Sequence, residues 1–289
     1  MTCDVFVVGS LHMDVVVDAP HLPRIDETVA GSHVAYQFGG KGGNQAVAAA
    51  RFGAKTAMAG RVGTDEFAHE LLAHLDASGV DARQIQRGDG ASGMSVAIVD
   101  SEGNYGAVIV SAANLEIVAD KIDIPPGTKI LLLQNEVPET LNIALAEKAK
   151  KAGTKVIMNA GPAREMPGSL LGLLDMLVVN RGEAALLSSV SEKEMIPGQA
   201  ARILREKGPS EVLVTLGEKG VVFLDAHNAL MEQPAFRVDV ISTHGAGDAF
   251  IGALAARLAT GSKTHEAIRF AQKAAARHVS TPVAERSST

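Results

Sequence analysis

The sequence predicts an α/β protein with a mostly parallel β-sheet, helices on both faces, and a small second β-sheet. Short apolar runs bounded by turn residues alternate along the chain with longer segments of helical periodicity. Such alternation is typical of parallel strands joined by crossover helices. Two segments interrupt it, because they alternate apolar and polar residues without a helical period.

The predicted strands of the main sheet are short and almost wholly apolar, as expected of strands buried on both faces. They cover residues 4–8, 56–59, 129–133, 155–158, 176–179, 211–215 and 221–224. The predicted helices cover residues 43–51, 65–78, 138–152, 182–187, 198–207, 247–259 and 263–278.

The two interrupting segments, residues 15–38 and 92–110, predict extra strands. They are inserted between helices of the main unit, so we expect them to pair as a small separate sheet at one edge of the core. Such a sheet leaves an apolar face exposed, which a second copy of the chain can cover.

A glycine-rich loop near the end of the chain opens a predicted helix and contains Asp248. Free N–H groups of Gly245, Ala246 and Gly247, with the positive end of the helix dipole, can hold charge on a transferring phosphoryl group. Asp248 is then a candidate general base for an attacking alcohol. An ordinary turn before an Asp-capped helix explains the same residues.

A second glycine-rich loop, residues 37–45, also opens a small-residue helix. Gly40 and Gly42 allow close approach of a ligand to the backbone, and Lys41 and Asn44 offer hydrogen-bonding groups to hydroxyls. The loop is not a Walker A motif, because Gly42 rather than Ser or Thr follows Lys41. A flexible turn with a surface lysine is the alternative.

Together the two loops resemble the signatures of the PfkB family of carbohydrate kinases, and most of all those of the ribokinases. Further matches follow in the family's order, at residues 9–14, 60–65, 135–138, 159–164, 180–183 and 215–220. The resemblance implies one ribokinase-like domain over residues 1–289, with residues 12–38 and 92–112 inserted as a lid over the sugar site. It also implies a homodimer formed through the lid.

On the sugar side, the resemblance implies that Asp14 and Glu136 accept hydrogen bonds from hydroxyls on opposite sides of the substrate. Asp14 could instead cap a turn, and Glu136 could be an exposed residue before a helix. His12 stands where ribokinases usually carry an Asn that contacts the sugar, so the acceptor can differ from ribose. The implied substrate-binding residues are His12, Asp14, Gly40, Lys41, Gly42, Asn44 and Glu136.

On the nucleotide side, the resemblance implies that Asn180 contacts the phosphates of ATP and that Glu183 holds Mg²⁺ through water. Their spacing also fits a plain helix-capping pair. The implied ATP-binding residues are Asn180, Thr215, Gly217, Gly220 and Gln272. Without the resemblance, a hairpin turn is the more common explanation of residues 215–220.

Ser242 replaces an Asp that in the family commonly binds an activating monovalent cation, which weakens the case for K⁺ activation. Residues 279–289 also lack the usual Gly-Ala turn that completes this cation site. Val283 stands near the expected glycine, and Ser287 is the remaining oxygen donor there.

Composition narrows the function further. A net charge of −6 without a basic cluster argues against nucleic acid, and no apolar run reaches the ~20 residues of a membrane span. One cysteine, Cys3, excludes an internal disulfide framework and a Cys-rich metal site, so a cytoplasmic protein is expected. The histidines show no zinc-site spacing, and the first strand is not followed by the glycine pattern of NAD enzymes.

We therefore expect an ATP- and Mg²⁺-dependent kinase that phosphorylates a hydroxymethyl group of a sugar, by default D-ribose to ribose 5-phosphate. A nucleoside kinase of the same fold is an alternative, because His12 could lie near a nucleobase. A catalytically weak sugar- or nucleotide-binding regulator is a second alternative, motivated by Ser242.

Overall fold

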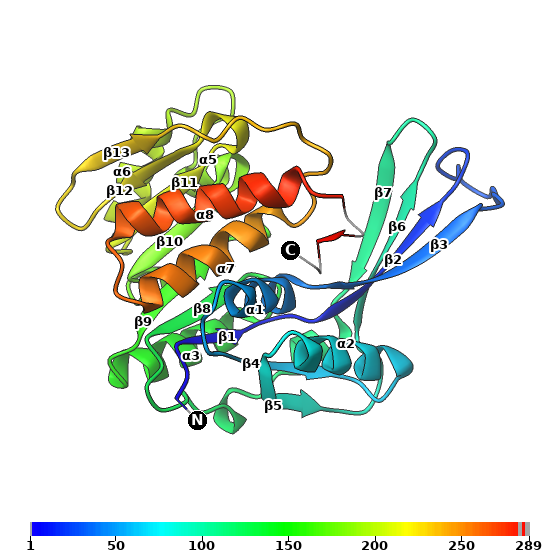
Figure 1. The fold of residues 1–289 in the computed structure, drawn as a ribbon, viewed down its shortest axis with the longest axis horizontal. Coiled ribbons are helices and arrows are strands. Elements are labelled where there is room, and N and C mark those ends of the chain that lie inside the picture. Colours follow the sequence, from blue (N-terminus) through cyan, green and yellow to red (C-terminus); the bar gives the residue numbers. More distant parts are fainter. Residues whose placement is uncertain (1, 283–284, 287–289) are drawn as a thin grey trace.

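The computed structural model describes residues 2–282 and 285–286. Within them, a nine-stranded sheet has the order β13-β12-β11-β10-β9-β8-β1-β4-β5, and a four-stranded sheet has the order β3-β2-β6-β7 (Figure 1). Neighbouring strands from β11 to β5 are parallel, and β12 and β13 are added antiparallel. The predicted fold class is confirmed.

The central strands of the main sheet are buried on both faces, which explains their continuous apolar sequence. In β1, Val5 and Val7 pack on one side of the sheet, whereas Phe6 and Val8 pack on the other. The strands are β1 (Val5–Val8), β4 (Thr56–Val62), β5 (Asp81–Arg87), β8 (Ile130–Gln134), β9 (Lys155–Asn159), β10 (Met176–Asn180), β11 (Glu211–Thr215), β12 (Val221–Leu224) and β13 (Leu230–Gln233).

Helices cover both faces of this sheet (Figure 1). One face carries α1 (Lys41–Arg51), α2 (Glu66–Ala77), α7 (Ala246–Ala259) and α8 (Thr264–Val279). The other carries α3 (Glu139–Lys151), α4 (Gly168–Leu171), α5 (Arg181–Ser188) and α6 (Pro197–Glu206). Short 3₁₀ helices are η1 (Ala112–Glu116), η2 (Ala119–Lys121) and η3 (Gly217–Lys219). None of the helices in the described residues has the length and apolar character to cross a membrane.

Helices α1 and α7 pack closely because small residues face each other. A Cβ atom on Gly252 would lie 2.4 Å from the Cβ of Ala48 and 2.8 Å from the backbone oxygen of Gln45. Real Cβ contacts are not that short, so only glycine fits at this crossing. The close approach brings the first turns of the two helices together.

The smaller sheet projects from the body as a lid (Figure 1). It consists of β2 (His12–Asp18), β3 (His33–Gly39), β6 (Gly93–Val99) and β7 (Tyr105–Val110). The β2–β6 pair is parallel, and the β2–β3 and β6–β7 pairs are antiparallel. Strands β2, β6 and β7 lie within the residues 12–38 and 92–112 expected for the lid, and β3 extends one residue past them, to Gly39.

Besides the 3₁₀ helices, two strands and one α-helix are absent from the sequence prediction. Strands β5 and β13 are the outermost strands of the main sheet, and their sequences, DARQIQR and LMEQ, are rich in polar residues. Edge strands need only a partly buried face, so they lack the apolar run that identifies a central strand. Helix α4 is only 4 residues long, too short to show a period.

Candidate active site

Polar side chains gather at the carboxyl edge of the parallel sheet. Strand β1 leads to Ser10, β8 to Glu136, β9 ends at Asn159, and β10 ends at Asn180. The carboxyl edge is where open α/β sheets bind ligands. The first turns of α1 and α7 reach this edge from one face and add Lys41 and Asp248.

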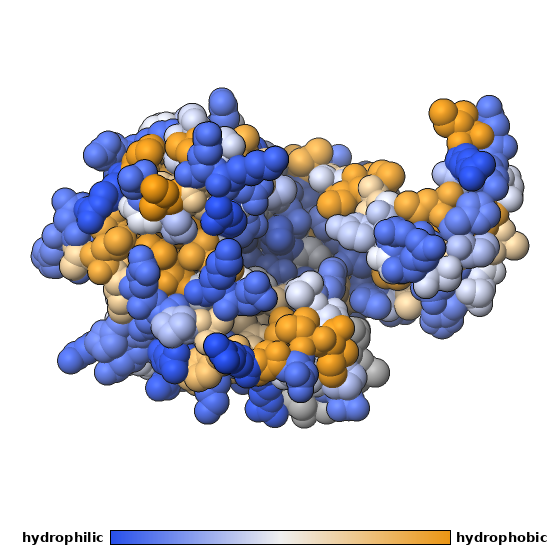
Figure 2. Space-filling view, turned by 90° about the horizontal axis from the view of Figure 1, so that it is seen from above, coloured by the Kyte–Doolittle hydropathy of each residue, from blue (hydrophilic) through white to orange (hydrophobic). Residues whose placement is uncertain are grey.

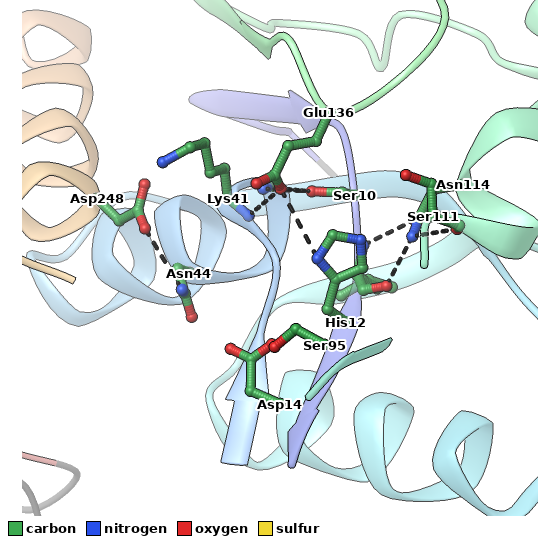
Figure 3. Close-up of polar contacts among 12 residues, drawn as sticks. Ser10, His12, Asp14, Lys41, Asn44, Ser95, Ser111, Asn114, Glu136 and Asp248 are labelled. Carbon is green, nitrogen blue, oxygen red and sulfur yellow. Dashed lines mark hydrogen bonds and ion pairs between the residues drawn. The ribbon is translucent and has the colours of Figure 1, made fainter. Parts of the chain in front are cut away.

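Asp248 lies in the first turn of α7 and is 9% exposed. Its Oδ1 accepts a 2.9 Å hydrogen bond from Nε2 of Gln45, and its Oδ2 accepts a longer one, 3.4 Å, from Nδ2 of Asn44 (Figure 3). Burial raises the pKa of Asp248, and nearby Lys41 opposes part of that rise. A buried carboxylate with a raised pKa is a stronger proton acceptor than an exposed one, as a general base requires.

Lys41 begins α1, and its ammonium group points toward Asp248 (Figure 3). Burial lowers the pKa of Lys41, but surrounding carboxylates outweigh burial and the pKa lies above its ordinary value. Those carboxylates belong to Asp248, Glu136 and Glu183. Among the described residues none of them forms a direct ion pair with the ammonium, so Lys41 can offer its charge to a bound anion.

Glu136 is held at the start of α1. Its Oε2 accepts hydrogen bonds from Oγ of Ser10 at 2.5 Å and from the backbone N–H of Lys41 at 2.8 Å. Its side chain is only 13% exposed, so the alternative of an exposed glutamate is wrong. With Oε2 occupied by the protein, Oε1 is the oxygen that can accept a hydrogen bond from a substrate hydroxyl.

His12 lies beside Glu136 and is 3% exposed. Its Nδ1 is 4.0 Å from Oε2 of Glu136 (Figure 3). Its Nε2 has no hydrogen-bond partner among the described residues. A buried lone pair is tolerated better than a buried unpaired N–H, so the geometry favours the proton on Nδ1. The Nδ1–H of His12 is then a hydrogen-bond donor beside the Glu136 carboxylate.

Asp14 faces this space from the lid. Its Oδ1 accepts a 2.5 Å hydrogen bond from Oγ of Ser95, its register partner on β6. Gly39 leaves room for the carboxylate, because a Cβ there would lie 2.0 Å from Oδ2 of Asp14. Asp14 is therefore part of the lid's strand pairing, and the alternative of a turn cap is wrong.

Asn180, which is expected to contact nucleotide, caps α5. Its Oδ1 accepts the backbone N–H of Glu183, while Oε2 of Glu183 accepts the backbone N–H of Asn180, both at 2.8 Å. The capping alternative is therefore realised in full. It uses one oxygen of Glu183 and leaves Oε1 beside Gly161 and Lys41. Burial raises the pKa of Glu183, whereas the hydrogen bond from the Asn180 backbone and the charge of Lys41 lower it in part.

Thr215 is the register partner of Asn180 on β11, so both lie at the same edge of the sheet. Gly217 and Gly220 form a tight connection through η3 to β12, which is antiparallel to β11 as the hairpin alternative predicts. Gln272 is 6% exposed and donates from Nε2 to the carbonyls of Gln233 and Pro234 at 3.3 and 3.2 Å. Its amide therefore binds the protein backbone.

Of the three N–H groups expected to be free at the start of α7, two are free in the described residues. The backbone N–H of Ala246 donates to the carbonyl of Thr243 at 3.2 Å, so the expectation of a free N–H is wrong there. Within the described part of the chain, the N–H groups of Gly245 and Gly247 have no partner. Ser242 also lies in this loop, whereas Val283 and Ser287 lie outside the described residues.

A cavity of about 590 Å³ opens beside Asp248, between the lid, α1, α2 and the loop before α7. Its lining includes Asn44, Tyr36 and Phe38. The space-filling view shows the deep hollow between the body and the lid (Figure 2). A larger depression, about 910 Å³, lies at Cys3, Lys55 and Asp81, away from these polar groups.

Four residues of this arrangement were missed in the sequence: Ser10, Gln45, Ser95 and Asn114. Asn114 binds both the N–H and the carbonyl of Leu11, each at 2.9 Å, and so fixes the start of β2. Gln45 follows Lys41 by one helical turn, a spacing that places both on one face of α1 and could have identified it.

Comparison with known proteins gives a consistent picture. The family described as "pfkB family carbohydrate kinase" matches residues 3–288. A ribokinase of Haemophilus influenzae is 34% identical over 276 residues, 93% of this chain and 90% of the relative. A deoxyribokinase of Salmonella typhi is 34% identical over 261 residues, 87% and 84% of the two chains. The structure of Arabidopsis thaliana ribokinase complexed with ribose and ATP superposes with a TM-score of 0.88 at 31% identity, covering 97% of this chain and 94% of that one.

Proposed function

This chain belongs to the pfkB family of carbohydrate kinases, and from that premise we propose that it transfers the γ-phosphate of ATP to a hydroxymethyl group of a pentose, with D-ribose as the default acceptor. The observation that carries the proposal is the buried carboxylate of Asp248, which lies beside two unpaired backbone N–H groups and an unpaired ammonium group. A base next to an anion site is what phosphoryl transfer to an alcohol requires.

The sugar would bind between the lid and the body. Asp14 from β2, Glu136 after β8 and His12 would pair with its hydroxyls, each already oriented by the protein contacts described above. Orientation of this kind directs the hydroxymethyl group toward Asp248 and lowers the entropic cost of the reaction.

Asp248 would then accept the proton of the hydroxymethyl oxygen as that oxygen attacks the γ-phosphorus. Negative charge on the phosphoryl group would be stabilised by the N–H groups of Gly245 and Gly247, the positive end of the α7 dipole, and Lys41. Lys41 was expected to bind sugar hydroxyls, but its position among three carboxylates supports a role with the phosphoryl group.

ATP would extend from this point along the carboxyl ends of β10 and β11, past Asn180 and Thr215 toward Gly217. The ATP-bound relative supports a nucleotide in this fold. No cluster of three acidic, His or Cys side chains that could cage a metal occurs in the described residues. Mg²⁺ suits such a site, because it keeps several waters and binds mainly to phosphates, whose charge it neutralises. Glu183 Oε1 is the protein oxygen that could hold one of those waters.

The relatives' names, ribokinase and deoxyribokinase, support a pentose acceptor. Among the residues proposed to bind the sugar, His12 departs from the ribokinase pattern, and its Nδ1–H would donate to a sugar oxygen. A buried donor that must be paired discriminates against acceptors lacking an oxygen at that place.

We also propose that the four-stranded sheet closes over the bound sugar and joins two copies of the chain. Its β7 strand is exposed along its whole length, including Tyr105 (71%), Val108 (66%) and Ile109 (60%). Apolar side chains are visible over the projecting lid in Figure 2.

The test of substrate is ADP release by the purified protein with Mg²⁺ and ATP against a panel of ribose, deoxyribose, other pentoses, hexoses and nucleosides. Turnover on a pentose supports the proposal. Turnover on nucleosides alone would establish the nucleoside-kinase alternative. Ligand binding without turnover on any acceptor would establish the regulator.

A further inference from the structure

Arg286, close to the end of the chain, is buried against the loop that leads into α7. It is 8% exposed, and its guanidinium donates to the carbonyl oxygens of Ser242 and His244, each at 2.9 Å. A third hydrogen bond, 3.1 Å long, runs from Nε to the carbonyl of Thr281. Carbonyls from two separate segments thus converge on one positive charge.

The contact with His244 fixes the direction of an N–H group in the site. In a trans peptide the C=O and the next residue's N–H point in opposite directions. Since the His244 carbonyl is turned toward Arg286, the Gly245 N–H is turned away from it. Gly245 has φ +75°, a conformation that few residues other than glycine adopt.

His278 holds the same carbonyl from α8, with Nε2 2.8 Å from the oxygen of His244. Burial lowers the pKa of His278, and the charge of Arg286 lowers it further, although the His244 hydrogen bond opposes both. A neutral ring donating from Nε2 suits a carbonyl acceptor. The loop is therefore held from outside at two points, while the N–H groups of Gly245 and Gly247 stay unpaired.

We propose that Arg286 acts as a built-in monovalent cation: it positions the anion-binding loop, residues 242–247, through its carbonyls and makes phosphoryl transfer independent of added K⁺ or Na⁺. Carbonyl oxygens that converge on a point are ligands for a cation, and the planar guanidinium can pair with several of them at once. Ser242 brings a hydroxyl where a bound inorganic cation would favour a carboxylate, and that hydroxyl accepts the N–H of His244 at 3.4 Å.

The position of Arg286 gives its charge a second effect. Arg286 and Asp248 line the same cavity, so the guanidinium lies near the N-terminus of α7. Its charge adds to the helix dipole at the place where the proposed function requires stabilisation of a phosphoryl group. The inference rests on that proposed function.

The first experiment needs no variant. ADP release by the wild-type protein with its best acceptor is measured in KCl, NaCl and tetramethylammonium chloride at equal ionic strength. We expect less than about a twofold difference among the salts, far below the ~10²-fold effects typical of a missing oxyanion contact. A K⁺ activation of tenfold or more would overturn the proposal.

The second experiment compares Arg286→Ala with Arg277→Ala, a matched control that removes an exposed charge from the end of α8. For Arg286→Ala we expect kcat to fall about 10- to 100-fold with little change in the KM for the sugar, and partial rescue by millimolar guanidinium or K⁺. Full activity, or a loss that neither cation rescues, would contradict a positioning role. Arg286→Lys keeps the charge but not the planar guanidinium, so its kcat should lie between those of Arg286→Ala and the wild type.

A binding measurement separates failure of this inference from failure of the proposed function. Calorimetry gives the affinities for ADP and for a non-hydrolysable ATP analogue without any acceptor. Arg286→Ala should weaken the binding of the ATP analogue by at least about fivefold more than the binding of ADP, because the loop is proposed to hold the γ-phosphate. Equal losses for both nucleotides would overturn the inference even if turnover is found.

Discussion

Gln45 and Asp248 lie 203 residues apart in the chain, yet Nε2 of Gln45 donates a 2.9 Å hydrogen bond to Oδ1 of Asp248. Gln45 is fully buried, and the same nitrogen also donates to Oδ1 of Asn159 at 3.2 Å. The close packing of α1 on α7 makes the contact possible. This donor lowers the pKa of Asp248, whereas burial raises it, so Gln45 helps to keep the carboxylate ionised.

Replacing Gln45 by leucine should therefore shift the acid limb of the pH profile. Asp248 must be ionised to accept a proton, and the variant lacks a donor that lowers its pKa. The acid limb of kcat/KM should move to higher pH, since the lost hydrogen bond stabilised the ionised carboxylate. Activity on the alkaline side of that limb should remain near wild type. A uniformly lower profile with an unshifted limb would contradict this role.

The sequence predicts the main sheet and its helices well because buried strands and amphipathic helices leave periodic patterns. It predicts Lys41 and Asp248 near the starts of two helices, where they lie in α1 and α7. Asp14, in contrast, lies inside β2, whereas the predicted strand begins only at residue 15. It could not predict the Ser95–Asp14 contact, which depends on the register between β2 and β6. Nor could it predict Arg286, whose contacts depend on how the chain returns to the α7 loop after α8.

Replacing Lys41 by methionine should lower kcat more than it raises the KM for the sugar. The ammonium lies among three carboxylates without a direct ion pair, where a phosphoryl group could bind it. We expect a loss of kcat of about 10²-fold, together with an acid limb moved upward because Lys41 also lowers the pKa of Asp248. The control is Lys129→Met, whose ammonium pairs with Asp4 far from the site. A change in KM alone would assign Lys41 to hydroxyl binding instead.

His12→Asn tests the origin of acceptor choice. The amide is smaller than the ring, and it relieves the buried unpaired Nε2. We expect the ratio of kcat/KM for ribose to that for deoxyribose to change by at least about tenfold, or ~1.4 kcal/mol. The same ratio in both proteins would remove His12 from the specificity-determining residues.

A charged residue introduced on the lid should dissociate the proposed dimer into monomers. Val108→Lys places an ammonium on the exposed apolar strand β7. Light scattering after size exclusion should show a dimer for the wild type and a monomer for the variant, because an unpaired charge in an apolar interface costs several kcal/mol. Ile196→Lys is the control, at an exposed apolar residue outside the lid. A monomeric wild type at all concentrations would refute the proposed interface.

The assignment of Asp248 as the base is tested by the turnover of Asp248→Asn with ATP, Mg²⁺ and the best acceptor of the panel. We predict a fall in kcat of about 10²- to 10⁴-fold, the usual contribution of a general base, with nucleotide and sugar affinities changed only a few-fold. The folded state raises the pKa of Asp248, so stability from its protonated form is present at low pH and lost as pH rises through that raised pKa. The melting temperature of Asp248→Asn minus that of the wild type should therefore increase as the pH rises. A cooperative melting transition of the variant also shows that the variant is folded. Turnover of the folded variant close to wild type would contradict the assignment of Asp248 as the base.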